Sequence, residues 1–496
     1  MTNSHVLRTL MDISLVRGPL PWTIWTLTAI VSVALLVMLV MTLLRPHGRD
    51  TVAPLTSASA SGDSRQNWPG SGVQGSAHMP ALPVAVVAAV GTGIVGLVVA
   101  WLISDVIMVF GVSFGWAVIF TIAAGFAGMG FAIAATVRTH HVQHVLAALL
   151  IPLALLSSAL HVDGIYGEYQ TVGSLVGYSP YASINDVTIH APTMTVSQWR
   201  KAAAAGTLPA DVPTHGKVLT VDIPNTKSQF AARRAMVYLP PAALAKRTPS
   251  LPVMELLAGQ PGSPGRLMAA GGIAAMMDTY ASSHHGLAPV VVVPDQNGAD
   301  AHNSLCADTT QGKAETYLTQ DVVDWAKRHL PVAKDAAMWA IGGFSQGGTC
   351  TTQLAPRHPE LYGAMLPVDG ELKPTSGSVD NMVRTYFGGN RAAYDAQVPV
   401  NAIAATGSSS QALFAGAGEQ DTESVKNMDT IADAAHKAGM EVTTVMIRGT
   451  GHDWHAVQAV WRPGLAWFGQ RTGLGEMTKS VKDYPQVDVQ RQEAQQ

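Results

Sequence analysis

The stretch "MWAIGGFSQGGTCTTQLAPRHPE", residues 338–360, decides how this chain folds. It begins with an apolar run typical of a buried strand and continues from Thr349 as a helix-like segment. Between the two lies the pattern G-x-S-x-G, centred on Ser345. A serine at such a strand-to-helix turn projects above the sheet, where its hydroxyl can act as a nucleophile. The alternative is an ordinary glycine turn with a surface serine, because the chain contains 47 glycines.

A second G-x-S-x-G match, "GVSFG" at residues 111–115, does not have this context. It lies where a long apolar segment begins, and no strand precedes it. The motif is informative only at a strand-to-helix turn, so we treat this second match as chance.

Compact apolar runs alternate with helix-like segments on both sides of Ser345. The segments 314–330 and 422–439 have helical spacing. The predicted strands around them include "LPVMELLAG", "APVVVVPD", "YGAMLPVDG", "QALFAGAG" and "EVTTVMIRG". Alternation of this kind predicts an α/β fold with a mostly parallel central sheet over residues 215–475.

A serine needs a base to become nucleophilic, and His452 is the candidate. It lies in the glycine-rich segment "GTGHDW", after a late predicted strand, and could accept the Ser345 proton. His455 is the rival, although it fits better in the helix that starts there.

The carboxylate that orients this histidine is expected between the serine and the histidine in chain order. We prefer Asp421, in the loop "GEQD" after a predicted strand. Glu419 in the same loop and Asp369 after an earlier strand are the rivals. Asp421 could alternatively serve as the N-cap of the helix that follows it.

Two backbone N–H groups are candidates for stabilising an oxyanion. Gln346 follows the serine at the predicted start of a helix, and Gln260 lies in "LLAGQPGSPG" after an early strand.

The first 161 residues have a different character, because four segments in them are almost free of charge. A bilayer-spanning helix needs about 20 consecutive apolar residues. We therefore predict four transmembrane helices, near residues 20–44, 82–104, 112–137 and 143–161. A cleaved signal peptide is the alternative for the first segment, but its apolar run is longer than usual and no small-residue cleavage site follows it directly.

The remaining segments connect these parts. The stretch 49–80 is rich in Ser, Gly, Ala and Pro, which predicts a flexible loop. Residues 162–214 are interpreted as a connector or small subdomain, and residues 476–496 as a polar, frayed tail.

Charge and cysteine usage limit the function and the location. A net charge of −3 without a basic stripe argues against a nucleic-acid partner. Arg45, Arg49 and Arg138 flank the spans in a way that places the C-terminal part outside the cytoplasm, whereas Arg8 and Arg17 favour the opposite orientation.

The chain has two cysteines, Cys306 and Cys350. In an exported domain they could form a disulfide, and two buried thiols are the alternative. No metal-ligand spacing is present, so we predict neither a metal site nor a cofactor.

Several motifs together resemble the "putative-esterase" family of α/β-hydrolases, which includes feruloyl and enterochelin esterases, S-formylglutathione hydrolase and mycolyltransferases. The motifs are "VYLPPA", "LLAGQPGSPG", "VVVVPDQNG", "ETYLTQDVVDW", "GGFSQGG", "GEQD" and "GTGHDW". The resemblance covers roughly residues 215–475, and the preceding spans are similar to those of actinobacterial membrane-bound esterases. It implies an α/β-hydrolase fold, a Ser345–Asp421–His452 triad, and Gln260 and Gln346 as oxyanion donors. Many hydrolases have His-Gly where this chain has Ala258-Gly259, which leaves a backbone donor in place.

The sequence thus predicts a membrane-anchored serine esterase acting on carboxylic esters of lipid or cell-envelope origin. An acyltransferase that moves the acyl group to a sugar or lipid alcohol would use the same triad. A third hypothesis, from another class, is a non-catalytic membrane scaffold with a hydrolase-like domain, which the order of Ser, Asp and His disfavours.

Overall fold

The computed structural model describes residues 2–44, 80–107, 113–300 and 302–493. It contains two compact units: a helical unit of residues 17–162, and a sheet unit of residues 1–16 together with 163–496. Nearly all of the predicted loop 49–80 lies outside the described residues, as do Gly111 and Val112 of the second G-x-S-x-G match.

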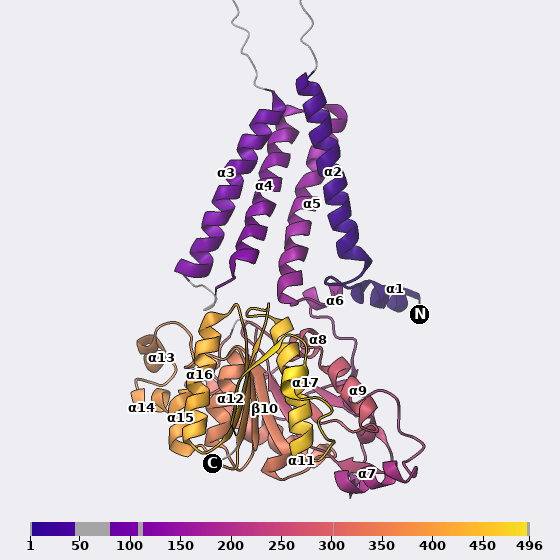
Figure 1. Ribbon diagram of the computed structural model, residues 1–496, viewed down its shortest axis with the longest axis vertical. Helices are drawn as coiled ribbons and strands as arrows, with labels where there is room; N and C mark the ends of the chain where they lie inside the picture. Colours follow the sequence, from indigo (N-terminus) through magenta and orange to yellow (C-terminus); the bar gives the residue numbers. More distant parts are fainter. Residues whose placement is uncertain (1, 45–79, 108–112, 301, 494–496) are drawn as a thin grey trace, which may run out of the picture. The chain divides into compact units, whose positions relative to one another are not determined.

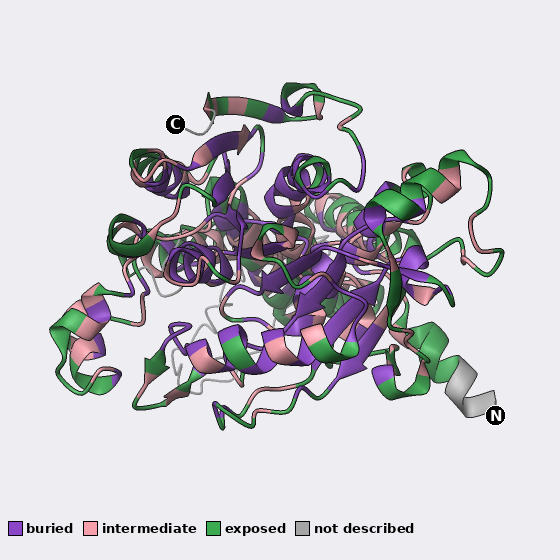
Figure 2. Ribbon diagram, turned by 90° about the horizontal axis from the view of Figure 1, so that it is seen from below, coloured by how far each residue is buried: buried purple, intermediate pink, exposed green. Residues whose placement is uncertain are grey.

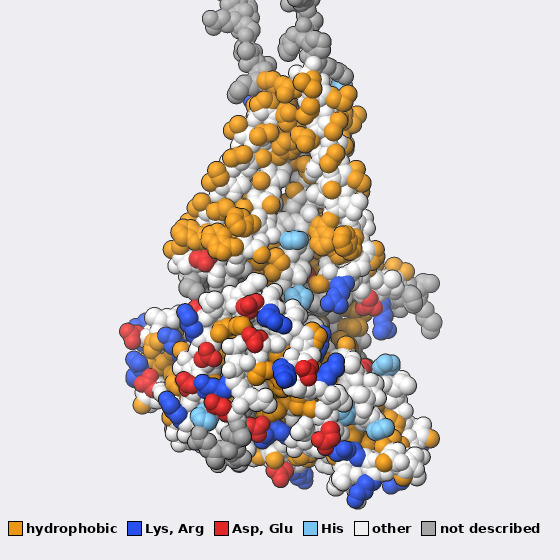
Figure 3. Space-filling view, in the orientation of Figure 1, with side chains coloured by type: hydrophobic (Ala, Val, Ile, Leu, Met, Phe, Trp, Pro, Cys, Tyr) orange, Lys and Arg blue, Asp and Glu red, His pale blue; other side chains and the backbone are white. Residues whose placement is uncertain are grey.

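The helical unit consists of four long helices (Figure 1): α2 (Pro19–Leu44), α3 (Ala81–Trp101), α4 (Trp116–Arg138) and α5 (His141–Tyr166). Their side chains give this unit a surface dominated by apolar groups, whereas charged groups are spread over the sheet unit (Figure 3). All four helices are long and apolar enough to cross a membrane. They confirm the four predicted apolar helices.

The sheet unit is built around one ten-stranded sheet. Its strands lie in the order β1-β3-β4-β7-β6-β10-β11-β12-β13-β14. Their bounds are β1 Ala182–Ser183, β3 Lys217–Val221, β4 Ala235–Leu239, β6 Val253–Leu257, β7 Val290–Val293, β10 Trp339–Phe344, β11 Ala364–Val368, β12 Ala412–Gly418, β13 Glu441–Ile447 and β14 Val487–Glu493. Two small sheets pair β2 (Pro192–Thr195) with β5 (Thr248–Ser250) and β8 (Asp308–Thr309) with β9 (Gly312–Lys313).

Six neighbouring strands, from β7 to β13 in sheet order, run parallel. In β6, β7, β10, β11 and β12 every residue is buried, which explains why these strands read as unbroken apolar runs in the sequence. The structure therefore confirms an α/β fold with a mostly parallel central sheet. Because the strands are parallel, their carboxyl ends meet at one edge, and the loops that follow them come together there.

Helices cover both faces of the sheet (Figure 1): α12, α15 and α16 on one face, and α8, α9 and α17 on the other. Figure 2 shows buried strands in the centre and helices with exposed outer faces around them. The helix bounds are α8 Pro264–Ala270, α9 Ile273–Ser283, α10 Ala314–Thr316, α11 Val323–His329, α12 Gln346–Arg357, α13 Val379–Thr385, α14 Arg391–Asp395, α15 Pro399–Thr406, α16 Thr422–Lys437 and α17 Trp454–Arg471. The predicted helix 314–330 forms as α10 and α11 joined by a π-helical segment at Tyr317–Val322.

The segment that follows α5 carries short elements of the sheet unit, α6 (Val172–Leu175) and α7 (Val196–Ala204) among them. The N-terminal helix α1 (Thr2–Met11) belongs to the same unit. The chain after α1 pairs with residues 170–172, because Leu15 N–H donates to the Gln170 carbonyl and Val172 N–H to the Ile13 carbonyl.

The C-terminal segment differs from the predicted frayed tail. Residues 487–493 form β14, which pairs antiparallel with β13 at the edge of the sheet. Val487 and Val489 alternate with exposed polar residues in this strand. An edge strand that buries only one face needs apolar residues at a few alternate positions. Because the other residues of this segment are polar, its sequence does not show a clear strand pattern.

Candidate active site

Ser345 lies at the turn between β10 and α12, in a backbone conformation that few side chains adopt. Its φ is 57° and its ψ is −118°. A non-glycine residue at such a φ costs about 1–3 kcal/mol, so the surrounding structure must hold it. Here the Ser345 N–H donates to the Val368 carbonyl at 2.9 Å, and the Ser345 carbonyl accepts from Thr349 N–H at 3.0 Å.

The glycines on either side of Ser345 allow this turn to close. A Cβ atom at Gly343 would overlap the backbone of Gly347, and a Cβ atom at Gly347 would overlap the Leu257 carbonyl of the neighbouring strand. Helix α12 thus begins directly against β10 and β6. The two glycines of the pattern G-x-S-x-G are therefore needed for α12 to pack this closely against the two strands.

His452 and Asp421 form a direct pair. The Nδ1 atom of His452 lies 2.7 Å from Asp421 Oδ2, and the two side chains are only 10% and 11% exposed. Asp421 Oδ1 also accepts from the N–H of Ser424, so this carboxylate caps α16 as well. The predicted cap and the predicted partner of the histidine are therefore one residue, whose two oxygens have separate contacts.

The pairing shifts the pKa values of both groups. Burial by itself would lower the pKa of His452, but the hydrogen bond to Asp421 and the nearby carboxylates raise that pKa above its ordinary value. Burial would raise the pKa of Asp421, yet the contacts with His452 and Ser424 hold that pKa below its ordinary value. The charged pair is thus favoured. With Nδ1 facing the carboxylate, the Nε2 atom is the nitrogen left for a substrate or nucleophile.

Phe344 connects the histidine to the nucleophile turn. Its ring centroid lies 4.9 Å from that of His452 and 4.9 Å from that of Trp454. Since Phe344 precedes Ser345, this packing brings His452 beside the turn. Among the described residues no hydrogen bond joins Ser345 Oγ to His452; such contacts are often long without a bound substrate.

The rival residues have other contacts. The exposed Glu419 accepts from the N–H of Gly449 at 2.8 Å. His455 lies at the start of α17, with Nε2 3.2 Å from the Gly164 carbonyl. Neither side chain is paired with His452.

Asp369, the other rival, lies close to the pair. It is buried, its Oδ1 accepts from Gly418 N–H at 2.9 Å, and its Oδ2 has no hydrogen-bond partner. Burial raises the pKa of Asp369 to about 8; the charge of Asp421 also raises it, and His452 and the Gly418 N–H oppose the shift. Asp369 and Asp421 are thus neighbouring acids whose pKa values are shifted in opposite directions.

The possible ligand atoms of Asp369, Asp421 and His452 all lie within 4.8 Å of one another. In the described part of the chain, this is the one group of three or more such residues that lie close enough together to hold a metal ion. These residue types do bind cations. However, the 2.7 Å contact between His452 and Asp421 already uses one donor atom of each residue. A metal ion would have to replace that contact.

The two predicted oxyanion segments flank the turn. Gln346 is the first residue of α12, and the first N–H groups of a helix have no partner within it. The loop after β6 lies against Ser345, because a Cβ atom at Gly259 would be 3.4 Å from the Ser345 Cβ. Gln260 follows in this loop, and its peptide bond to Pro261 is cis. The structure thus brings both segments next to Ser345.

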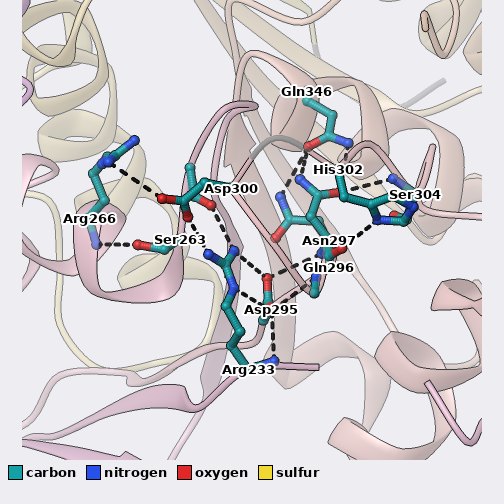
Figure 4. A network of polar contacts seen from close by, with 12 residues as sticks. Arg233, Ser263, Arg266, Asp295, Gln296, Asn297, Asp300, His302, Ser304 and Gln346 are labelled. Carbon is teal, nitrogen blue, oxygen red and sulfur yellow. Dashed lines mark hydrogen bonds and ion pairs between the residues drawn. The ribbon is translucent and has the colours of Figure 1, made fainter. Parts of the chain in front are cut away.

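The loop after β7 holds both oxyanion segments in place (Figure 4). The side chain of Gln346 bonds to Asn297, with distances of 2.7 and 3.0 Å, and to Asn303 at 2.7 Å. Gln296 Nε2 donates to the Ala258 carbonyl at 2.6 Å. Asp295 binds Arg233, which donates to the Gly262 carbonyl at 2.8 Å.

These supporting residues were not predicted from the sequence. One signal was available, because Asp295, Gln296 and Asn297 are polar residues directly after the buried strand β7. Polar groups at the carboxyl end of a parallel strand are where ligand sites of α/β sheets form.

Cys306 and Cys350 form a disulfide in the structure. Cys350 lies in α12, five residues after Ser345, and Cys306 lies in the loop after β7. The bond therefore joins α12, the helix that follows Ser345, to the loop after β7, whose side chains contact Gln346.

Comparisons with known proteins found similar sequences and similar structures. A family model described as "Putative esterase" matches residues 230–468. An uncharacterized protein of Corynebacterium glutamicum is 31% identical over 344 residues, which cover 66% of this chain and 77% of that protein.

Solved structures similar to this chain include three that each match about half of it. A ferulic acid esterase is 19% identical, with 52% of this chain and 99% of that chain covered and a TM-score of 0.44. An S-formylglutathione hydrolase from Agrobacterium tumefaciens is 20% identical, with 53% and 97% covered and a TM-score of 0.43. Mycobacterium tuberculosis MPT51 is 17% identical, with 52% and 98% covered and a TM-score of 0.38.

Proposed function

Because the chain belongs to the "putative esterase" family, we propose that it is a serine hydrolase that cleaves carboxylic esters through an acyl-enzyme on Ser345. The family itself supports a hydrolase-type enzyme that acts on esters. The strained turn at Ser345 and the His452–Asp421 pair, at one edge of the sheet, support the serine mechanism.

In this mechanism Ser345 Oγ attacks the ester carbonyl carbon while His452 Nε2 takes the hydroxyl proton. Asp421 stabilises the imidazolium that forms. The N–H groups of Gln346 and Gln260 stabilise the negative oxygen of the tetrahedral intermediate. The intermediate then expels the alcohol, to which His452 returns the proton, and the acyl group remains on Ser345.

The second half of the reaction decides between hydrolysis and transfer. His452 activates either water, which releases a free acid, or an acceptor alcohol, which yields a new ester. We propose hydrolysis as the main reaction. The purified enzyme should be incubated with an ester and a sugar or lipid alcohol; free acid as the sole product at every acceptor concentration excludes transfer, and a new ester establishes it.

The proposal places the enzyme in the cytoplasmic membrane, with the sheet unit outside the cytoplasm and with lipid or cell-envelope esters as substrates. Four helices that can cross a membrane support the anchoring. An enzyme tethered in this way encounters amphiphilic esters at the lipid surface.

Labelling with a fluorophosphonate probe tests the nucleophile. We expect the wild-type protein to react and Ser345→Ala to lose the label, because the probe phosphonylates an activated serine. Ser113→Ala is the matched control, since Ser113 is the central residue of the second G-x-S-x-G match. Labelling that survives in Ser345→Ala would refute Ser345 as the nucleophile, and an unreactive wild type would refute the serine mechanism and favour the scaffold hypothesis.

A further inference from the structure

The helical unit contains a cavity of about 710 Å³ that lies between its helices. Residues of all four helices line it, and all of them belong to the helical unit. Ligand sites commonly have volumes of about 300–1,000 Å³, so this cavity is large enough for part of a lipid.

Helix packing explains why the space exists. Helices α3 and α4 pack tightly, because Gly96 meets the Phe126 side chain and Gly130 meets Thr92. On its other side α4 presents small residues, Ala124 and Gly128 among them, to the cavity. Helix α5 packs close to Gly128, because a Cβ atom there would lie 3.3 Å from the Ala154 Cβ. The cavity is the space left between this contact and α2.

One end of the cavity is polar. Trp25 of α2 lies beside His161 of α5, with ring centroids 6.1 Å apart, and its Nε1 donates to the Ser157 carbonyl. Ser158 donates to the Thr121 carbonyl at 3.1 Å, which joins α5 to α4 at the same end. These residues all line the cavity.

The other end is apolar. Leu36 of α2, Phe131 of α4 and Leu150 of α5 line it. Along α5 the lining changes from Leu150 through Ala154 to His161, so polarity rises steadily along one face of the helix. The gradient matches the two ends of an amphiphile.

Three polar groups on the cavity wall lack partners in the protein. Among the described residues, the hydroxyls of Ser32 and Ser157 and the imidazole of His161 form no hydrogen bond. Serines in membrane helices usually bond to a backbone carbonyl one turn earlier, as the threonine Thr28 does here. These groups are exposed or half-buried, so they are accessible to a ligand, and within a bilayer a ligand that bonds to them would be favoured over lipid tails that cannot.

The lining includes no Asp, Glu, Lys or Arg. A charged head group would have no counter-charge within the cavity, and burying it there would be costly. The head that fits is uncharged and carries hydroxyl or ester oxygens.

We infer that the helical unit binds a neutral acyl lipid of the diacylglycerol type. Its acyl chain lies between Leu36, Phe131 and Leu150, and its hydroxyl or ester oxygens bond to Ser32, Ser157 and His161. The binding does not depend on the proposed chemistry at Ser345, because the cavity lies wholly within residues 17–162.

Photo-crosslinking in nanodiscs of phosphatidylcholine tests this inference. The full-length protein is reconstituted with a diacylglycerol that carries a diazirine in one acyl chain, and the adducts are mapped by mass spectrometry. We expect adducts on cavity-lining residues of α4 and α5. Adducts spread evenly over all lipid-facing positions of the four helices would overturn the inference.

Two variants that fill the cavity make the test specific. Ala124→Trp on α4 and Ser32→Leu on α2 should each lower the labelling about tenfold, because they occupy the site from opposite walls. Ile133→Trp places a tryptophan at an exposed position of α4 outside the lining and should label like wild type. Equal labelling of the filled variants and Ile133→Trp would refute the site.

Competition tests the head group. Excess unlabelled diacylglycerol should suppress the adducts, whereas excess phosphatidylglycerol, whose head is charged, should leave them. Suppression by both to the same extent contradicts a neutral-lipid site. Ser345→Ala should label like wild type, so a failure of the proposed catalysis would be recognised separately.

Discussion

Asp421 and His452 are the residues whose local contacts bear most directly on the chemistry. One oxygen of Asp421 caps α16 and the other binds His452. The cap fixes the carboxylate, and the carboxylate fixes the imidazole. Asp369 beside them accepts from the Gly418 N–H, and burial raises its pKa to about 8, whereas the pKa of Asp421 is held below its ordinary value.

The first prediction concerns these two acids. Asp421→Asn should lower kcat by up to about 10⁴-fold, because an amide cannot stabilise the imidazolium or hold its tautomer. Asp369→Asn should change kcat far less, since its Oδ1 contact with Gly418 is retained. Steady-state kinetics on a soluble ester measure kcat for both variants. A larger loss of kcat in Asp369→Asn would show that Asp369, not Asp421, is the carboxylate that supports His452.

The same pair predicts a pH profile. The proposed mechanism needs neutral His452, so kcat/KM should rise with pH through the His452 pKa, which lies above the ordinary histidine value. Removing the negative charge in Asp421→Asn should move this limb to lower pH. If the rise of kcat/KM occurs at the same pH in Asp421→Asn as in the wild type, a group other than His452 controls it.

Glu255 gives a stability prediction at the residue scale. This carboxyl is fully buried in β6 and accepts from the Tyr362 hydroxyl at 2.9 Å. Burial raises its pKa from 4.5 to about 8. Between these two values the folded state keeps the proton while the unfolded state releases it, so stability should fall as pH rises, by at most about 1.4 kcal/mol per pH unit.

Glu255→Gln should therefore reduce the loss of Tm between pH 5 and pH 8. Some dependence should remain, because the raised pKa of Asp369 acts in the same direction. Glu419→Gln, at an exposed acid, should follow the wild-type curve. Parallel curves for wild type and Glu255→Gln would mean that Glu255 is charged in the folded protein.

At the scale of elements, the loop after β7 sets the geometry of the nucleophile turn. Its side chains bond to Ala258 in the loop after β6 and to Gln346 at the start of α12. The disulfide also joins the loop after β7 to α12. Three segments far apart in sequence thus form one rigid frame around Ser345.

Asn297→Ala should release the Gln346 side chain and displace its backbone N–H. We expect kcat to fall about ten- to a hundredfold with little change in KM, because small displacements of catalytic groups have effects of this size. The exposed Asn401 supplies a matched control as Asn401→Ala. If Asn297→Ala changes KM alone, the loop contacts the substrate and does not position the oxyanion donors.

At the scale of the whole molecule, the proposal that the four apolar helices of the described residues cross a membrane implies that the segment before α2 and the sheet unit lie on one side of it. The N-terminal segment fits this arrangement, because residues 13–15 pair with residues 170–172 of the sheet unit. The proposed orientation puts Arg8 outside the cytoplasm with the sheet unit, against the preference of arginine for the cytoplasmic side.

Cysteine labelling in intact cells tests the proposed orientation. Ser410→Cys introduces a thiol at an exposed position of the sheet unit and should react with a membrane-impermeant maleimide. Ser57→Cys lies between the first two predicted spans and should react only after lysis. The opposite pattern would place the sheet unit in the cytoplasm.

The sequence by itself determined the four apolar helices, the alternation of strands and helices, and the turn at Ser345. These follow from local patterns: apolar length, side-chain periodicity, and glycines where backbones approach closely. Tertiary structure alone decided that Asp421 contacts His452 while Asp369 lies beneath and Glu419 binds a backbone N–H. It alone paired residues 487–493 with β13 and joined Asn297 to Gln346. Such contacts join residues 30 to 51 positions apart, and only the packing of the whole sheet sets those distances.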